Sequence, residues 1–169
     1  DTMEHVLLLD MAIHTFDQAR FICGKNPLAV YCHEWNPKGS WYRHGASANA
    51  IFEMSDGVVF NYRGSWCAEG IETSWECEWR ASCERGNLLW DGARELRGRR
   101  VVDGAEPKFT LDKQPVAWVR TNDLEHEGHA GVIDEFINAI HHGTRPQTHC
   151  EDNINSLAMV HAATESAKT

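Results

Sequence analysis

The sequence predicts an α+β fold in which an open, mostly antiparallel β-sheet carries helices on one face. Helical periodicity near both ends of the chain, over about residues 4–23 and from about residue 132 onward, predicts the helices. Short β-prone segments separated by Gly, Asn, Asp and Pro fill the middle and predict the strands. Helices set apart from a run of strands in this way are typical of α+β domains.

The first predicted helix runs from Glu4 to Cys23, with Asp1 or Thr2 as its N-cap and Gly24 as its stop. One stripe along it is formed by Leu9, Ile13, Phe16 and Arg20. The neighbouring stripe carries three titratable groups at i, i+4 and i+7, which are Asp10, His14 and Asp17. The spacing therefore places these three groups on one face of the helix.

The middle region begins with a predicted hairpin. Ala46 to Met54 and Val58 to Trp66 flank an Asp-Gly pair, a strong turn signal between two β-prone runs. Thr73 to Cys83 then alternates between Trp, Cys or Ala and charged residues, which predicts a strand with one covered side.

Two further strands, Gly86 to Trp90 and Leu96 to Val102, are predicted to join across Asp91-Gly92, and Asp103 to Pro115 is predicted to be a loop. The compact basic run of the chain, with arginines at positions 94, 97, 99 and 100, falls in this region. We interpret the run as a solvated turn, and a phosphate site is the alternative.

Seven tryptophans lie in the predicted strands and loops: Trp35, Trp41, Trp66, Trp75, Trp79, Trp90 and Trp118. A sheet with helices on one face leaves its other face to be covered, and an uncovered aromatic face would be an exposed hydrophobic patch that favours association. We therefore expect that face to be available for dimerisation, so that the protein is a homo-oligomer, either a dimer or a tetramer.

Two helices are predicted to close the chain. The first carries Val132, Phe136, Ile137 and Ile140 on one face and ends at His141-His142-Gly143. The second has Glu151 and Asp152 near its N-terminus, where the helix dipole favours acids. Its apolar side is expected to begin with Ile154, Leu157 and Ala158 and to continue at His161.

Composition narrows the class of protein. The 169 residues, with 42% hydrophobic content, fit a single globular domain with a sizeable core. The formal net charge of -9 argues against a nucleic-acid partner. There is no apolar run of membrane-spanning length and no signal-peptide arrangement, so we expect a cytoplasmic protein without a membrane partner. Both chain ends suggest an excised domain.

We expect no metal site and no disulfide framework. The six cysteines are scattered without a CxxC pair, so we expect most of them to be buried thiols. His126 and His129 flank Glu127, but their i, i+3 spacing departs from the i, i+4 spacing of the zinc-protease HExxH motif.

The residues that carry chemistry are expected on the first helix. A histidine is the side chain best suited to exchange a proton with a hydroxyl near neutral pH, and a carboxylate one turn away can hold the same hydroxyl. Asp10 and His14 have this spacing, which puts their Cβ atoms about 5 to 6 Å apart. Spacing alone is a weak signal, because any DxxxH on a helix shares it.

The surrounding residues make the signal more specific. Leu8 to Asp17 resembles the DxGxHxxD helix of the Gfo/Idh/MocA oxidoreductases, the family of glucose-fructose oxidoreductase and inositol dehydrogenase. Phe52 to Gly57 is similar to that family's central hairpin, and Ile133 to Pro146 is similar to its closing helix and the following turn. The resemblance extends over nearly all of this chain but over only the C-terminal half of a family member.

The resemblance implies a substrate-binding and dimerisation domain, attached in the full protein to an N-terminal Rossmann domain that binds NAD or NADP. The chain has no GxGxxG and no Glu-Lys-Pro motif, so we expect the isolated fragment to be inactive. On the matching positions His14 would be the general acid/base and Asp10 its partner at the hydroxyl. Asp17 would have a structural or orienting role. Ala12 stands where the family motif has glycine.

Substrate contacts from the sheet are harder to place. The polar-aromatic candidates are Trp41, Tyr42, Arg43, His44, Arg63 and Trp66, and Asp17 of the first helix is a further candidate. We expect the substrate to be a sugar, a polyol or a related hydroxy compound. A non-catalytic metabolite sensor and a structural dimerisation module of the same fold remain alternatives.

Overall fold

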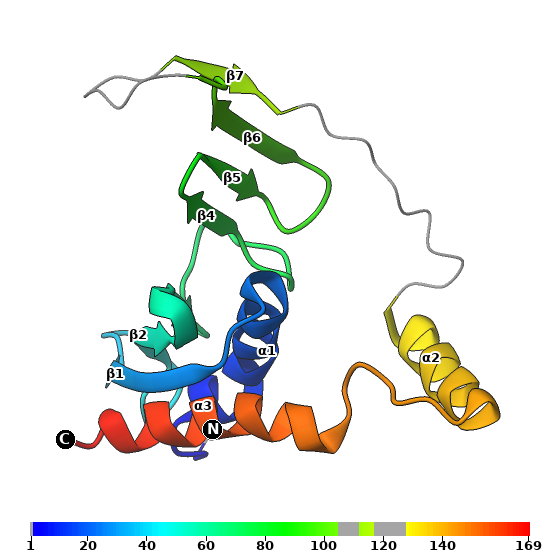
Figure 1. The fold of residues 1–169 in the computed structure, drawn as a ribbon. Coiled ribbons are helices and arrows are strands. Elements are labelled where there is room, and N and C mark those ends of the chain that lie inside the picture. The colour runs from blue at the N-terminus through cyan, green and yellow to red at the C-terminus, as the bar shows by residue number, and fades with distance from the viewer. Residues whose placement is uncertain (1, 105–111, 117–127) are drawn as a thin grey trace. The chain divides into compact units, whose positions relative to one another are not determined.

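The computed structural model describes residues 2–104, 112–116 and 128–169 (Figure 1). Three α-helices and two antiparallel open sheets confirm the predicted α+β class. The chain divides into two compact units. The first unit joins Asp1–Gly70 with Phe136–Thr169, and the second unit is Ile71–Glu135.

The sheet of the first unit has three antiparallel strands in the order β1-β2-β3. They are β1 (Pro27–Trp35), β2 (Ser47–Met54) and β3 (Val59–Ser65). A 3-10 turn, η2 (Ser55–Gly57), joins β2 to β3 and confirms the predicted hairpin. Asp56 and Gly57 have φ of 57° and 74°, the left-handed region that short polar residues and glycine adopt most readily.

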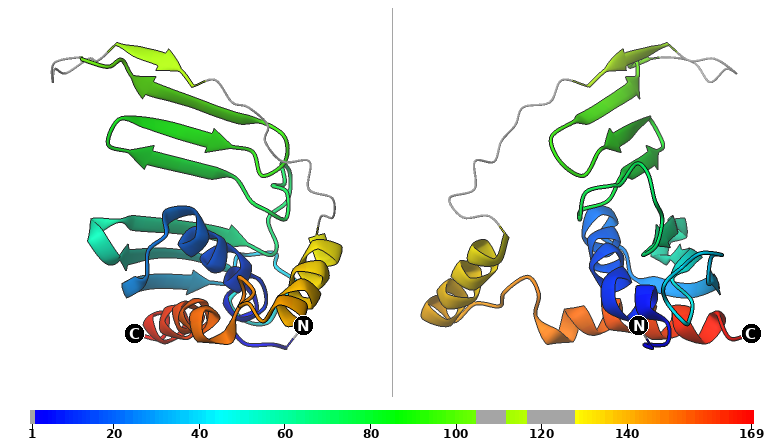
Figure 2. Two further views of the ribbon diagram at one scale, coloured as in Figure 1. Left: turned by 45° about the vertical axis from the view of Figure 1, so that its right-hand side comes forward. Right: turned by 180° about the vertical axis from the view of Figure 1, so that it is seen from behind.

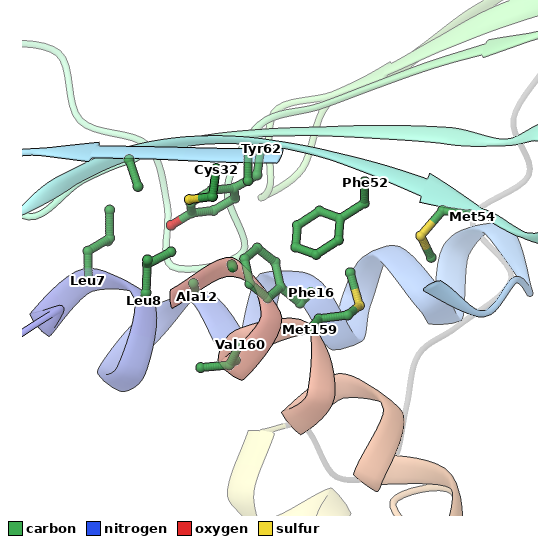
Figure 3. Close-up of a cluster of buried hydrophobic side chains, with 13 residues drawn as sticks. Leu7, Leu8, Ala12, Phe16, Cys32, Phe52, Met54, Tyr62, Met159 and Val160 are labelled. Atoms are coloured by element: carbon green, nitrogen blue, oxygen red, sulfur yellow. The ribbon is translucent and has the colours of Figure 1, made fainter. Parts of the chain in front are cut away.

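One face of this sheet is covered by η1 (Leu7–Met11) and α1 (Ala12–Cys23) from the N-terminal part and by α3 (Cys150–Ser166) from the C-terminal part (Figure 2). Alternation along β2 turns Ala48, Ala50, Phe52 and Met54 toward the helices. Figure 3 shows Phe52 and Met54 facing Phe16 of α1 and Met159 of α3. Phe16 lies edge-on to Phe52 and to Tyr62, at centroid distances of 4.8 and 5.1 Å.

The N-terminal helix begins later than the sequence predicts. The chain enters it through a turn at Glu4 and His5. Val6, not Thr2, stands at the N-cap of η1, and Asp1 lies outside the described residues. Its first regular part, η1, is a π-helix, in which Leu7 and Leu8 are buried. Its end at Gly24, with φ of 63°, is as predicted.

The buried side of α3 differs from the prediction. Ile154, Leu157, Ala158 and His161 are exposed, whereas Met159, Val160 and Ala163 are buried. The buried side also includes Ser156 and Thr164. Both are polar, and the periodicity of apolar residues would assign them to the exposed side. Both are satisfied on the buried side, since Ser156 bonds to α1 and the Thr164 hydroxyl donates to the Val160 carbonyl at 2.9 Å.

The second unit contains a four-stranded antiparallel sheet in the order β4-β5-β6-β7. Its strands are β4 (Trp79–Cys83), β5 (Gly86–Trp90), β6 (Leu96–Val101) and β7 (Lys113–Pro115). The predicted strand Thr73 to Cys83 is therefore shorter. The predicted loop Asp103 to Pro115 contains β7, which pairs with β6 and so satisfies its backbone groups, while residues 105–111 of that loop lie outside the described residues.

The boundary between the units falls within α2 (Gly128–His142), which ends before Gly143 as predicted. Val132, Phe136 and Ile140 of its apolar side are more than half exposed. In the part of the chain that the structure describes, no helix has both the length and the apolar character to cross a membrane.

The six cysteines are free thiols, and the expectation that most are buried is wrong. Cys32 is buried, while the others are half-buried or exposed. Burial raises the pKa of the Cys32 thiol to about 11, with a smaller contribution from Glu34. This thiol is a core residue without thiolate character near neutral pH.

Replacing Phe16 tests the core. Phe16→Ala should lower the free energy of unfolding by about 3 to 5 kcal/mol, because the change leaves a cavity beneath two aromatic rings. Phe21→Ala, on the exposed side of the same helix, should change it by less than about 0.5 kcal/mol. Denaturant unfolding followed by circular dichroism measures both, and equal effects would contradict this core.

Candidate functional site

Asp10 and His14 lie on the side of the N-terminal helix that faces away from the sheet. Ala12 and Phe16 are fully buried against the sheet, and residues two positions from them point to the opposite side of a helix. Both Asp10 and His14 are exposed. The predicted pair is therefore presented outward, where a hydroxyl compound can reach it.

The π-turn lies directly beside this pair. The Ala12 amide donates to the Leu7 carbonyl, five residues back, so η1 is wider than the α1 turns that follow. The wider turn lets Leu7, Leu8 and Ala12 all reach the core while Asp10 stays outside. π-Turns within helices occur frequently at functional sites.

Asp17, the third acid of the predicted stripe, is tied to α3. Ser156 donates its hydroxyl to Asp17 Oδ1 at 2.5 Å, and Arg20 Nη1 lies 3.7 Å from the same oxygen. Asp17 is half-buried. These contacts give Asp17 a part in holding the two helices together, and they set it apart from the outward pair.

The centre of this network is Arg20, a cation whose side chain is 7% exposed. It donates to both carboxylate oxygens of Asp152 at 3.1 and 2.8 Å, to Ser156 Oγ at 2.9 Å and to Asn26 Oδ1 at 3.2 Å. The hydrogen bond from Arg20 holds the pKa of the Asp152 carboxyl below its usual range. A bidentate Arg–carboxylate pair of this kind fixes the orientation of α1 on α3.

A second polar link lies at the entrance to the helix. His5 Nδ1 and Glu34 Oε2 are 2.5 Å apart and join the turn before η1 to strand β1. The Glu34 side chain is more than nine-tenths buried, and its other oxygen has no hydrogen-bond partner among the described residues. His5 has a positive φ of 52°, which is uncommon for a residue with a side chain.

The sheet candidates separate into two groups. Tyr62 contacts Phe16 on the helix side of β3, so its neighbour Arg63 belongs to the opposite, uncovered face. The structure therefore does not bring Arg63 to Asp10 and His14. Trp66 is half-buried and packs against the core.

The loop candidates lie between β1 and β2. Trp41 is 63% exposed and contacts the Tyr42 ring at 5.3 Å, Arg43 is exposed and His44 is half-buried. Their surface position leaves them available to a ligand, which is the condition that a substrate contact requires.

Sequence reasoning missed the roles of Arg20, Asp152 and Ser156. The sequence places Arg20 on the same helix stripe as three apolar residues, and the pattern gives no reason for a cation there. Ser156 carries no signal in the sequence, because its hydrogen-bond partners are 136 and 139 residues away. An arginine at a core position of an amphipathic helix was the available clue, since buried arginines are normally paired.

The described residues contain no group of three His, Cys, Asp or Glu side chains arranged to hold a metal ion. His126 and Glu127 lie outside them. The sequence contains no GxGxxG, the turn that holds the pyrophosphate in Rossmann domains.

The fold and the Asp10–His14 helix define an α+β domain with a polar site on its outer helix. The sequence of residues 2–89 matches the GFO/IDH/MocA C-terminal domain, and the chain belongs to this family. The uncharacterized protein y4oX of Sinorhizobium fredii is 23% identical over 168 residues, which are 98% of this chain and 46% of that protein.

Solved structures share the fold. An oxidoreductase from Agrobacterium radiobacter in complex with NAD+, L-tartaric acid and magnesium is 18% identical, with a TM-score of 0.71 over 95% of this chain and 46% of that one. Aldose-aldose oxidoreductase from Caulobacter crescentus, complexed with glycerol, is 17% identical, with a TM-score of 0.69 over 95% of this chain and 45% of that one. The chain thus spans about half the length of these relatives.

Removing Arg20 tests the network beneath the site. Arg20→Ala should lower the free energy of unfolding by about 2 to 4 kcal/mol, because it removes a buried side chain and leaves Ser156 and the half-buried Asp17 without their cationic neighbour. Lys25→Ala, which removes the exposed ion pair with Asp56, should cost less than about 0.5 kcal/mol.

The Arg20 effect should also depend on pH. The depressed pKa of Asp152 stabilises the fold above its ordinary value of 3.8, and this contribution is lost as the pH falls through the lower folded-state pKa. The difference between wild type and Arg20→Ala should therefore shrink below pH 3.8. If the difference in unfolding free energy between wild type and Arg20→Ala stays constant after the carboxyl groups are protonated, the effect of Arg20 comes from packing.

Proposed function

We propose that this chain is the substrate-binding and dimerisation domain of an NAD(P)-dependent oxidoreductase that acts on a sugar, a polyol or a related hydroxy compound. The observation that carries the proposal is the exposed Asp10–His14 pair on a helix whose other side is firmly packed. Structural relatives support the substrate class, since one is an aldose-aldose oxidoreductase and another a UDP-N-acetylglucosamine 3-dehydrogenase.

His14 is the general acid/base of the proposed reaction. Its ring takes the proton from the substrate hydroxyl as the carbinol is oxidised, and returns it in the reverse direction. Asp10 accepts a hydrogen bond from the same hydroxyl or orients the imidazole. Packing of Ala12 and Phe16 against the sheet holds the helix, so neither group has to be ordered when substrate binds.

A bound nicotinamide would accept the hydride that leaves the carbinol carbon. One structural relative is solved with NAD+ and another is described as NADPH-dependent, which supports this class of cofactor. Because this chain lacks the glycine-rich turn, we assign cofactor binding to an N-terminal Rossmann domain outside it, and we expect the isolated fragment to be inactive. Trp41, Arg43 and His44 are the proposed substrate contacts of this domain.

Substitution of His14 in the full-length protein tests the enzyme. His14→Ala should lower kcat by about 10² to 10⁴-fold, the usual contribution of a positioned acid/base, and Asp10→Asn should lower it less. The matched control is His161→Ala, an exposed histidine of α3. Nicotinamide absorbance with a panel of sugars, polyols and sugar acids is the readout, with thermal unfolding run on each variant.

The results separate the alternatives. Turnover that survives in His14→Ala would contradict the assigned role. Saturable binding of a panel compound without turnover, by protein shown to bind a nicotinamide, would favour a metabolite sensor.

Association through the uncovered face of the β1–β3 sheet is the second part of the proposal. Opposite the helices this face carries Tyr31, Ile51 and Val59, which are 66%, 49% and 56% exposed. His33 stacks on Trp35 at 5.7 Å on the same face, and Arg63 lies in the same row as His33 with Asn49 between them. Exposed apolar side chains gathered on one sheet face are typical of an interface.

Charging the middle of this face tests association. Ile51→Lys, on the central strand, should convert an oligomer to a monomer at micromolar concentration because it places an unpaired charge in the interface. Ile154→Lys on α3 is the control and should leave the association unchanged. Sedimentation velocity measures the state, and a wild-type protein that is already monomeric would refute an interface here.

A further inference from the structure

The four-stranded sheet of the second unit has one basic face. Antiparallel register places Arg80 beside Leu89 and Leu89 beside Arg97, and in the next row it places Asn87 beside Arg99 and Arg99 beside Pro115. The described strand residues on this face are Arg80, Ser82, Asn87, Leu89, Arg97, Arg99, Val101, Lys113 and Pro115. Four of these are basic and none is acidic.

The opposite face of the same sheet is apolar in two rows, and its third row, Cys83, Gly86, Arg100 and Gln114, is partly polar. Trp79, Trp90 and Leu96 form one row across it, and Ala81, Leu88 and Gly98 form the next. A sheet with this division has one side suited to packing against apolar surface and one side suited to water or to an anion. Arg97 and Arg99 are therefore not needed for packing. Residues 96–100 of the basic run lie in strand β6, as the predicted strand Leu96 to Val102 has them, so the interpretation of the run as a turn is wrong for these residues.

A groove runs along the basic face. It has a volume of about 470 Å³, and its lining residues are Asn87, Leu89, Leu96, Arg97, Gly98, Arg99, Pro115 and Val116. Arg97, Arg99 and Asn87 are the polar residues of this lining, and the others are apolar residues or glycine. Ligand sites for small molecules have this size and this mixture of apolar surface with a few polar groups.

Both guanidinium groups keep donors for a ligand. Arg97 Nε contacts Glu95 at 3.2 Å, and Arg99 donates one hydrogen bond, at 3.3 Å, to the Lys113 carbonyl. Each contact engages a single nitrogen of a group that has five N–H donors. The Arg97 side chain is 68% exposed, so its remaining donors are accessible from solvent.

We propose that this groove binds a small phosphate monoester, with the phosphate on Arg97 and Arg99 and the apolar part of the ligand on Leu89 and Pro115. The planar fork of arginine matches the oxygens of a phosphate, and two such forks side by side suit a dianion. The formal net charge of -9 opposes a long polyanion, whereas the local groove can still attract a small one. The site uses neither Asp10 nor His14 and does not depend on the proposed oxidoreductase function.

Calorimetric titration of the protein with phenyl phosphate, inorganic phosphate and phenol tests the proposal. Phenyl phosphate combines both parts of the expected ligand, so it should bind more tightly than inorganic phosphate, and phenol should bind more weakly than either. Arg97→Ala/Arg99→Ala should lower the affinity for phenyl phosphate by about tenfold or more, because each lost charged hydrogen bond is worth a factor of that order in affinity. Arg97→Gln/Arg99→Gln, which keeps a polar side chain and removes the charge, should show the same loss.

The control is Arg85→Ala/Arg94→Ala, which makes the same change in net charge at exposed arginines outside the groove and should leave affinity within about twofold. No detectable phenyl phosphate binding by folded wild-type protein would overturn the proposal, as would an equal loss in the control. Tighter binding of a short single-stranded oligonucleotide would point to a nucleic-acid surface instead. A change of sedimentation coefficient in the Arg97 and Arg99 variants would assign the face to self-association.

Discussion

Burial of Phe16 is the constraint on which the orientation of the N-terminal helix depends. Its ring lies against Phe52 and Tyr62 from two strands, whereas Phe21, the other aromatic residue of α1, is 75% exposed. Once Phe16 and Ala12 face the sheet, helical geometry turns Asp10 and His14 outward. The exposed pair is thus a consequence of core packing, and the rigid side of the helix positions its reactive side.

A polar network strengthens this arrangement at the helix flank. Arg20 joins α1 to α3, and Ser156 links the same point to Asp17. The three titratable groups of the predicted stripe therefore divide into an outward pair and a structural acid. That division follows from the position of α3, which lies beside Asp17 and leaves the side of Asp10 and His14 uncovered by described residues of the first unit.

Local signals predicted much of the fold. The turn at Asp56 and Gly57, the stop at Gly24 and strand β5 are set by backbone preferences of nearby residues, so the sequence carries them directly. The buried side of α3 could not be predicted, because Ser156 is buried by partners on another helix. The face of Arg63 likewise depends on strand register. The family resemblance located Asp10 and His14, which spacing alone would have left as one acid–histidine pair among many.

The central claim is that His14 meets the reacting hydroxyl, and a crystal structure of the full-length protein with its hydroxy substrate bound is the most direct test. The account predicts that a ring nitrogen of His14 lies about 2.6 to 3.2 Å from a carbinol oxygen, with the Asp10 carboxylate at the same hydroxyl or at the imidazole. A substrate bound elsewhere, with His14 facing bulk solvent, would contradict it.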